Sequence, residues 1–338
     1  MIYPLLRPWL FRLDPERAHG LTMRLLDLSH RCGIDRLLTR HPAGRPVTAM
    51  GLSFPNPVGL AAGLDKNGSH IAALGALGFG FIEIGTVTPR PQPGNPKPRM
   101  IRLPRERAII NRMGFNNGGV EALVENVRAS AYTGIIGINI GKNATTPLEN
   151  AADDYLSAMD TAYPHAAYLA INISSPNTRN LRQLQQVDEL SILLARLKER
   201  QQRLADRHGR YVPLALKIAP DMDDDHLAAV ARTLVDNRVD GVIATNTTLS
   251  RPGIDDPALA AEAGGLSGAP LTALSTRVVT RLARELDGAL PIIGSGGIMC
   301  GADAAERLSA GAALVQIYSG LIYRGPDLVA ECINATAR

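Results

Sequence analysis

The sequence is poor in cysteine and in aromatic residues, and it contains no long apolar stretch. Its 338 residues include three cysteines, Cys32, Cys300 and Cys332, whose spacings match no metal-binding or redox motif. Such a sparse, odd set is typical of free thiols in a reducing compartment. No segment approaches the roughly 20 apolar residues that a membrane-spanning helix needs, and the N-terminus lacks the small-residue cleavage site of a signal peptide. We therefore expect no disulfide, no transmembrane helix and no signal peptide.

A strong excess of one charge is also absent. The chain has 36 Lys and Arg against 32 Asp and Glu, and its basic residues form no cluster outside the N-terminus. Proteins that bind nucleic acid usually concentrate basic residues on one element, so we expect no nucleic-acid partner. With 45% hydrophobic residues, the composition is that of a globular protein with one large core.

Short apolar runs rich in β-branched residues alternate with helix-like segments from residue 46 onward. Near-continuous apolar runs between helices indicate buried parallel strands. Eight such units predict an α/β fold of the (β/α)8, or TIM, barrel type, and a doubly wound open sheet is the alternative. The runs are 57–62, 81–86, 135–141, 168–174, 213–219, 240–246, 291–297 and 313–319, and helices are expected at 188–207, 223–237, 271–287 and 301–311.

Residues 1–40 stand apart from this repeat and predict a helical hairpin. Asp14-Pro15-Glu16 is a helix start, because Asp caps a helix and Pro fits its first position. Apolar residues then recur three and four positions apart, and Gly33 is placed to end this helix. An earlier helix is limited or kinked by Pro8.

Residues 41–47 read as a linker into a barrel domain spanning 46–338. Two roles for the hairpin remain open. It is either a plug that closes the barrel floor or a module that meets a membrane surface or a lipophilic ligand, since four arginines lie beside its apolar faces.

Uncharged polar residues dominate the positions that follow the strands, where barrel enzymes place their chemistry. Almost every strand end carries an amide, a hydroxyl, a lysine or a glycine. Histidine is absent there, and the nearby carboxylates are Asp65 and Glu83. This pattern argues against a metal site and against paired-carboxylate glycosidase chemistry. It favours a large polar ligand held by neutral hydrogen bonds and one or two cations.

Glycine segments after the last two strands predict a phosphate site. Residues 294–297 (GSGG) and 318–320 (YSG) lie where barrels commonly bind phosphate through backbone N–H groups. Residues 264–271, expected to open the helix after the sixth strand, would add further donors.

Lys217 ends the fifth apolar run, and a buried lysine requires an anionic or electron-rich partner. Beside a flavin it would stabilise the negative charge of the reduced ring. A Schiff-base lysine of an aldolase or lyase is the alternative, and the amide-rich surroundings favour the flavin.

The ordered motifs GLAAGLDKNG, IEIGTVTPRPQPGNPKPR, INRMGFNN, GINIGKN, INISSPNT, ALKIAPD, GVIATNTT, GGLSG, PIIGSGGI and LVQIYSG closely resemble dihydroorotate dehydrogenase. The resemblance covers essentially the whole chain and is closest to the membrane-associated, quinone-dependent class 2. It implies an FMN-dependent enzyme that oxidises (S)-dihydroorotate to orotate in pyrimidine (UMP) biosynthesis and passes the electrons to a membrane quinone.

The resemblance also implies roles for individual residues. Ser175 is implied as the catalytic base, where the other class of the family has cysteine, and the quinone path is implied at His19, Arg102 and Tyr318. Substrate binding is implied for Lys66, Asn111, Arg112, Met113, Gly114, Phe115, Asn172, Asn177, Asn246 and Thr247. FMN binding is implied for Ala62, Gly63, Leu64, Asp65, Lys66, Thr86, Asn139, Asn172, Lys217, Thr245, Gly268, Gly297, Tyr318 and Ser319.

A serine base needs activation by its surroundings. Thr178 is the nearest partner in sequence and would pass the proton on through a water, and residues 176–182 read as a lid that excludes water. The family often has valine where Ser295 stands, and no change of function is expected from that difference.

Location and partners follow from the resemblance in the same way. We expect a peripheral protein on the cytoplasmic side of the inner cell membrane, as a monomer or weak homo-oligomer. Three alternatives stay open: the soluble class that uses fumarate or NAD, which lacks the hairpin; a lyase or aldolase barrel built on Lys217; and a non-catalytic scaffold.

Overall fold

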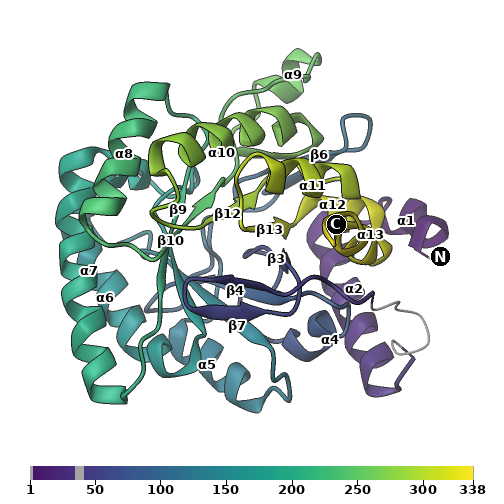
Figure 1. Ribbon diagram of the computed structural model, residues 1–338. Coiled ribbons are helices and arrows are strands. Elements are labelled where there is room, and N and C mark those ends of the chain that lie inside the picture. Colours follow the sequence, from purple (N-terminus) through teal and green to yellow (C-terminus); the bar gives the residue numbers. More distant parts are fainter. Residues whose placement is uncertain (1–2, 35–41, 338) are drawn as a thin grey trace.

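A closed parallel barrel forms the centre of the computed structural model, which describes residues 3–34 and 42–337 (Figure 1). Each barrel strand pairs with the next barrel strand along the chain. The last one, which contains Val315, pairs with the first, which contains Val58, and so closes the barrel. This closure confirms the (β/α)8 barrel, and the open-sheet alternative is wrong. Among the described residues, the eight barrel strands are β3 (Val58–Leu60), β4 (Phe81–Val87), β7 (Ile135–Ile140), β8 (Tyr168–Asn172), β9 (Leu214–Ile218), β10 (Gly241–Ala244), β12 (Ile292–Ser295) and β13 (Leu314–Ile317).

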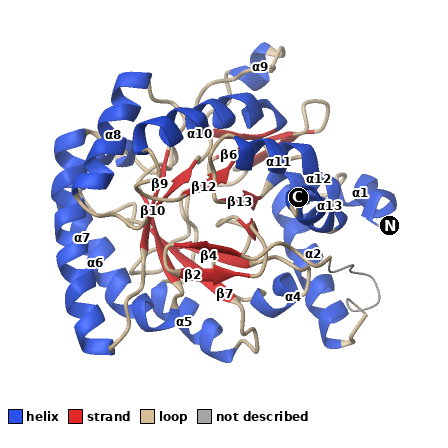
Figure 2. Cartoon of the chain, in the orientation of Figure 1, coloured by secondary structure: helices blue, strands red, loops and turns tan. Residues whose placement is uncertain are grey.

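Helices surround the barrel (Figure 2) and bury the outer face of its strands, which explains why the strands are apolar on both faces. The four helices predicted around the barrel are confirmed, with boundaries shifted by at most two residues, as α7, α8, α10 and α11. The α-helices after the N-terminal pair are α4 (Ile71–Gly75), α5 (Val120–Ala129), α6 (Ala151–Ala162), α7 (Val187–His208), α8 (Asp224–Asp236), α9 (Pro257–Ala260), α10 (Thr272–Leu286), α11 (Gly301–Ser309), α12 (Ser319–Arg324) and α13 (Asp327–Thr336). Short 3₁₀ helices are η1 (Leu148–Asn150), η2 (Tyr163–His165), η3 (Leu181–Gln185) and η4 (Ala269–Leu271).

An antiparallel hairpin of β1 (Val47–Ala49) and β2 (Leu52–Phe54) closes the barrel floor. Phe54 packs edge-on against Phe81, with ring centroids 5.1 Å apart, and Phe81 contacts Tyr168 in the same way. Phe54 ends β2, whereas Phe81 and Tyr168 begin β4 and β8, and all three belong to one buried apolar cluster. The floor is therefore filled by a β-hairpin, which the sequence analysis did not predict.

A second, three-stranded antiparallel sheet lies over the barrel mouth. It contains β5 (Met100–Leu103), β6 (Ala108–Asn111) and β11 (Gly265–Gly268), in the order β11-β6-β5. The expectation that residues 264–271 open a helix is thus wrong for its first part, because 265–268 pair with β6. The pairing joins segments more than 150 residues apart, and no local pattern encodes it.

The N-terminal pair of helices is α1 (Tyr3–Leu10) and α2 (Pro15–Arg31), as expected from the sequence. The Asp14 carboxylate accepts the N–H groups of Glu16 and Arg17 at 3.1 and 3.0 Å and so caps α2. The pair packs against α4, α12 and β5 at the side of the barrel (Figure 1), so it is not the plug of the floor. Residues 35–41, part of the predicted hairpin and linker, lie outside the described residues. Among the helices described, none is both long and apolar enough to cross a membrane.

Candidate active site

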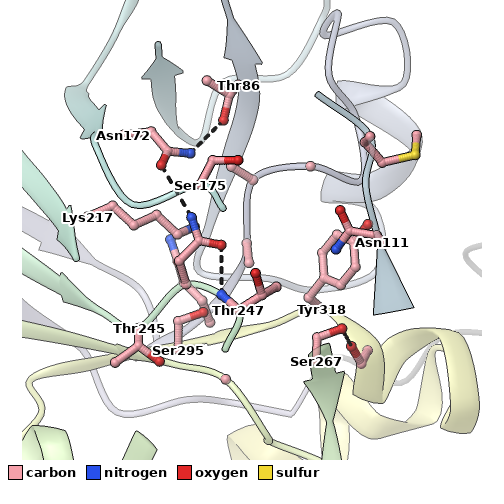
Figure 3. Close-up of a pocket in the computed structure, with 18 of the residues that line it drawn as sticks. Thr86, Asn111, Asn172, Ser175, Lys217, Thr245, Thr247, Ser267, Ser295 and Tyr318 are labelled. Atoms are coloured by element: carbon pink, nitrogen blue, oxygen red, sulfur yellow. Dashed lines mark hydrogen bonds between the residues drawn. The ribbon is translucent and has the colours of Figure 1, made fainter. Parts of the chain in front are cut away.

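A cavity opens at the carboxyl ends of the barrel strands (Figure 3). Each barrel strand except β7 contributes to the described lining, through its last residues or the loop that follows, and β6 and β11 add residues from above. The lining is rich in amides, hydroxyls and glycines and contains two lysines, Lys66 and Lys217. No described histidine or carboxylate lines it.

Most of the residues implied for binding come together in this cavity. Those that line it are Ser175, Ala62, Gly63, Lys66, Thr86, Asn111, Met113, Gly114, Phe115, Asn172, Asn177, Lys217, Thr245, Asn246, Thr247, Gly268, Gly297, Tyr318 and Ser319.

Four residues of the implied FMN and substrate sets do not line this cavity. Leu64 and Asp65 face a second cavity, described below. The Arg112 guanidinium pairs with Glu262 at 2.8 Å. Asn139 is fully buried, and its amide oxygen accepts the Thr86 hydroxyl at 2.6 Å, so it supports a lining residue without being one.

Glu83 is a fully buried carboxylate in the barrel interior. It accepts hydrogen bonds from Asn139 Nδ2 and Tyr168 Oη at 2.8 Å and from Gln316 Nε2 at 2.6 Å. Its Oε1 lies 3.6 Å from Lys217 Nζ, and the Lys217 side chain is itself 7% exposed. A buried charge is tolerated only when it is paired and hydrogen-bonded, and Glu83 has both kinds of partner. The anionic partner that the sequence required for Lys217 is therefore present in the protein.

A chain of side-chain hydrogen bonds runs from Glu83 to the cavity wall. The Thr86 hydroxyl, held by Asn139, accepts Asn172 Nδ2 at 2.9 Å, and Asn172 Oδ1 accepts Asn246 Nδ2 at 3.3 Å (Figure 3). Because a carboxylate can only accept, it fixes the donor side of Asn139 and hence the orientation of each amide that follows. The cavity thus presents amides whose donor and acceptor ends are set in advance.

Ser175 lies in the loop after β8, faces this cavity and is 5% exposed. Its Oγ accepts the Asn177 N–H at 3.2 Å, which favours electron density on that oxygen. Thr178, also buried, has an Oγ1 without a hydrogen-bond partner among the described residues.

The loop that carries Ser175 is held by Arg182. Its guanidinium donates to the carbonyl oxygens of Ser174 at 2.9 Å and Thr247 at 2.8 Å, and it pairs with Asp221 at 2.7 Å. Asp221 in turn accepts the N–H of Leu249 at 3.1 Å. One arginine therefore joins the loops after β8, β9 and β10, which fixes the position of Ser175 relative to two other walls of the cavity.

A glycine turn after β12 forms the opposite wall. Gly296 and Gly297 have φ values of 102° and 73°, which only glycine adopts easily. An added Cβ at Gly297 would lie 2.4 Å from the backbone of Thr272. Two buried lining oxygens, Thr247 Oγ1 and Gln316 Oε1, have no partner among the described residues. Unsatisfied buried polar atoms in the same cavity as a glycine turn fit a large polar ligand with an anionic group.

A second cavity lies between the N-terminal helices and the barrel. Its lining is largely apolar and includes His19, Arg102 and Tyr318. It shares Gly63, Lys66, Met113 and Tyr318 with the first cavity, so the two are separated by one layer of residues.

Burial shifts the pKa values of ionisable residues in and beside this shared wall. Burial, with Arg99 nearby, lowers the pKa of Lys66 to about 8, against the opposing effect of Glu16 and Asp65. Burial, with Lys66 and His70 nearby, lowers the pKa of His19 to about 4, so His19 is neutral near pH 7. Burial also raises the pKa of Tyr318 to about 12.

The sequence analysis did not assign Gln316, Ser267, Arg182 or the role of Glu83. Gln316 is the polar residue inside an otherwise apolar run, and such a break in the pattern is a usable signal. Ser267 enters through the unpredicted strand β11, and Arg182 acts through carbonyl groups, which leave no mark in the sequence.

Comparison with known proteins gives a consistent picture. The family model for dihydroorotate dehydrogenase matches residues 46–337. The dihydroorotate dehydrogenase (quinone) of Chromobacterium violaceum is 66% identical over 100% of this chain and 98% of its own. That of Thiobacillus denitrificans is 61% identical over the full length of both chains. The crystal structure of ligand-free DHODH from Eimeria tenella superposes with a TM-score of 0.85 at 37% identity, covering 95% of this chain and 94% of the other.

We predict that Arg182→Ala frees the loop that carries Ser175. The substitution removes two hydrogen bonds to carbonyl oxygens and one ion pair, each of which is charge-assisted and therefore strong. Hydrogen exchange of the amides of residues 175–182 should accelerate at least about tenfold, while exchange in the barrel strands stays unchanged. Arg196→Ala is the matched control, because Arg196 makes a single exposed ion pair with Asp153. Unchanged exchange in the loop of the Arg182 variant would contradict the conclusion that Arg182 holds this loop in place.

Proposed function

The chain belongs to the dihydroorotate dehydrogenase family, and we propose that it oxidises (S)-dihydroorotate to orotate in pyrimidine (UMP) biosynthesis with bound FMN, passing the electrons to a membrane quinone. The observation that carries this proposal is that Ser175 and the amides of Asn111, Asn172, Asn177 and Asn246 face one cavity in a chain with these relatives. The relatives are named as quinone enzymes, which counts against the class that uses fumarate or NAD. The family match counts against a lysine-based lyase and a non-catalytic scaffold.

The first cavity fits FMN. The glycine turn at 296–297 with Gly268 and Ser319 would hold the phosphate, and Thr86, Asn172 and Lys217 would bind the ring. The partnerless oxygens of Gln316 and Thr247 would find donors on the ligands. When bound, FMN supplies the acceptor for the hydride that leaves the substrate.

The substrate is a cyclic imide with a carboxylate, and its oxidation product, orotate, is flat. Asparagine amides offer both a donor and an acceptor and can pair its polar edge, and the Lys66 ammonium would pair its carboxylate. Because Glu83 fixes the amides through Asn139 and Thr86, little reorganisation is required when the substrate binds.

Ser175 would remove the proton from the ring carbon next to the one that loses the hydride. The Asn177 N–H at its Oγ would stabilise the charge that develops there, and Thr178, whose Oγ1 has no hydrogen-bond partner among the described residues, would pass the proton on through a water. The contacts of Arg182 would hold the loop that carries this oxygen beside the cavity and would help the loop to exclude water.

The second cavity would admit the quinone. Its largely apolar lining suits a lipophilic ring and tail, and the four residues it shares with the first cavity put a quinone next to the FMN site. The helices α1 and α2, which contribute to its lining, expose Leu5, Trp9 and Leu28, which are 72%, 66% and 57% exposed. Exposed arginines lie in the turn between these helices, at position 12, and on α2, at positions 17 and 24. An apolar face with basic residues is suited to the surface of an anionic membrane, which supports a peripheral position at the inner membrane.

A visible spectrum tests this function directly. The purified protein should be yellow, should lose that colour anaerobically when dihydroorotate is added, and should regain it with a quinone analogue but not with fumarate or NAD. A protein that stays colourless after FMN is supplied would overturn the proposal. Recovery of colour with fumarate or NAD would instead assign it to the other class.

Ser175→Ala should retain FMN and bleach far more slowly with dihydroorotate. General base catalysis typically contributes about a hundredfold to ten-thousandfold, and the loss should fall in that range. Stopped-flow absorbance under anaerobic conditions measures it. Ser174→Ala, one residue away, is the control and should bleach much faster than the Ser175 variant, although it loses a bond to Asn246. A Ser175 variant that bleaches at the wild-type rate would sink the assignment.

The pH dependence should report Lys66. With its pKa at about 8, the side chain is charged below that pH and neutral above it. We expect kcat/KM for dihydroorotate to fall above about pH 8, approaching tenfold per pH unit, because the neutral amine no longer pairs with the substrate carboxylate. In Lys66→Arg, whatever its absolute rate, this fall should disappear. A flat wild-type profile between pH 7 and 9.5 would rule this role out.

A further inference from the structure

Arg307 is a fully buried arginine behind the glycine turn of the first cavity. It lies on α11 and has no exposed surface. Its side chain passes over Gly294, where an added Cβ would lie 2.4 Å from Arg307 Cγ. Glycine at position 294 of β12 therefore makes space for the Arg307 side chain. The proposed reaction does not require this arginine.

The Arg307 guanidinium is bound by neutral oxygens. It donates to Ser275 Oγ at 2.6 Å and to the carbonyl oxygens of Gly296 at 3.0 Å, Ser295 at 3.3 Å and Thr272 at 3.3 Å. No described carboxylate lies within 4 Å, and its Nε has no partner among the described residues. Burial lowers the pKa of Arg307 to about 10, against Glu306 and Asp303, so it remains charged at neutral pH. A buried cation without a carboxylate partner favours an anion nearby.

The carbonyl contacts orient the glycine turn. The peptide bonds before Gly296 and Gly297 are trans, so each N–H points away from the C=O of the same peptide unit. Because Arg307 binds the carbonyl oxygens of Ser295 and Gly296, the N–H groups of Gly296 and Gly297 are directed to the opposite side. Both glycines line the first cavity, and neither N–H has an acceptor among the residues described.

We infer that Arg307 is a positioning residue for the phosphate of FMN: it fixes the two glycine N–H groups that face the cavity and supplies the positive charge behind them. The inference rests on the proposed function. It concerns a residue that need not touch the ligand, because the peptide groups stand between the guanidinium and the cavity. Its charge acts through low-dielectric protein, where a full charge is screened little.

The preference for FMN over riboflavin tests this role, because the two ligands differ only in the phosphate. The full-length protein is compared as wild type, Arg307→Lys, Arg307→Gln and Arg307→Met. Flavin fluorescence measures FMN release from the diluted holoenzyme and riboflavin binding to the flavin-depleted chain. We expect Arg307→Met to lose roughly ten- to a hundredfold in FMN affinity with riboflavin affinity nearly unchanged. The preference should fall in the order Arg, Lys, Gln, Met, since charge matters more than a neutral donor.

The matched control is Gln201→Met, which removes a buried polar side chain from α7, away from both cavities. It should leave the FMN preference intact even if it lowers the melting temperature. If Arg307→Met does not fold, the Lys and Gln variants decide, and a Gln variant that keeps as much preference as Lys overturns the inference. Equal losses of FMN and riboflavin affinity, or no loss, also overturn it. A wild type that binds neither flavin fails the proposed function itself, which is a different result from a wild type that binds FMN regardless of residue 307.

Discussion

The buried carboxylate of Glu83 is the point on which the arrangement of the active site depends. It lies inside the barrel, where an isolated charge is strongly disfavoured, and it is satisfied by groups from four other strands: Asn139 on β7, Tyr168 on β8, Lys217 on β9 and Gln316 on β13. The loss of any one of these partners would leave the carboxylate less well satisfied, and the loss of Lys217 would remove its cation. The requirement to satisfy one carboxylate therefore fixes the side chains of five strands at the level just below the cavity.

This constraint passes to the ligands through amides. Asn139 uses its N–H on Glu83, so its oxygen takes the Thr86 hydroxyl, and the Thr86 oxygen takes Asn172. A network of this kind is stable only when every member is satisfied. Gln316 and Thr247, which both line the cavity, each keep a side-chain oxygen without a partner among the described residues, and a ligand can satisfy both. Arg307 and Arg182 act in a similar way on the backbone. Each binds carbonyl oxygens behind a wall, and the groups presented to the ligand lie on the other side.

The sequence predicts the parts of this structure that have a local cause. The eight strands follow from apolar runs that alternate with helices, and α2 follows from its Asp14 cap and apolar spacing. The β1–β2 floor and the sheet of β5, β6 and β11 could not be predicted, because their pairings are set by tertiary contacts rather than propensity. The position of Lys217 in its strand predicted that it needs an anionic or electron-rich partner, but it did not identify Glu83 as that partner. Which side chains meet inside a barrel depends on the order and tilt of the strands, and a single strand does not reveal either. The contacts of Arg182 and Arg307 could not be predicted for a different reason. Both bind backbone carbonyl oxygens, and because every residue has one, the sequence does not indicate which of them is bound.

The wall between the two cavities shows why a helical segment is joined to this barrel. The first cavity is polar and can bind charged ligands, whereas a lipophilic acceptor requires an apolar site, and one pocket cannot meet both demands. The N-terminal helices create the apolar site outside the barrel, over the Gly63 turn, where a side chain would meet Tyr318 at 3.3 Å. Gly63 keeps this wall thin, and Tyr318, held neutral by burial, adds no charge to it. Lys66 supplies a cation to the polar side, and burial together with that nearby cation keeps His19, on the apolar side, neutral near pH 7. The two half-reactions of the proposed function would thus take place in two cavities of different polarity, separated by one layer of residues.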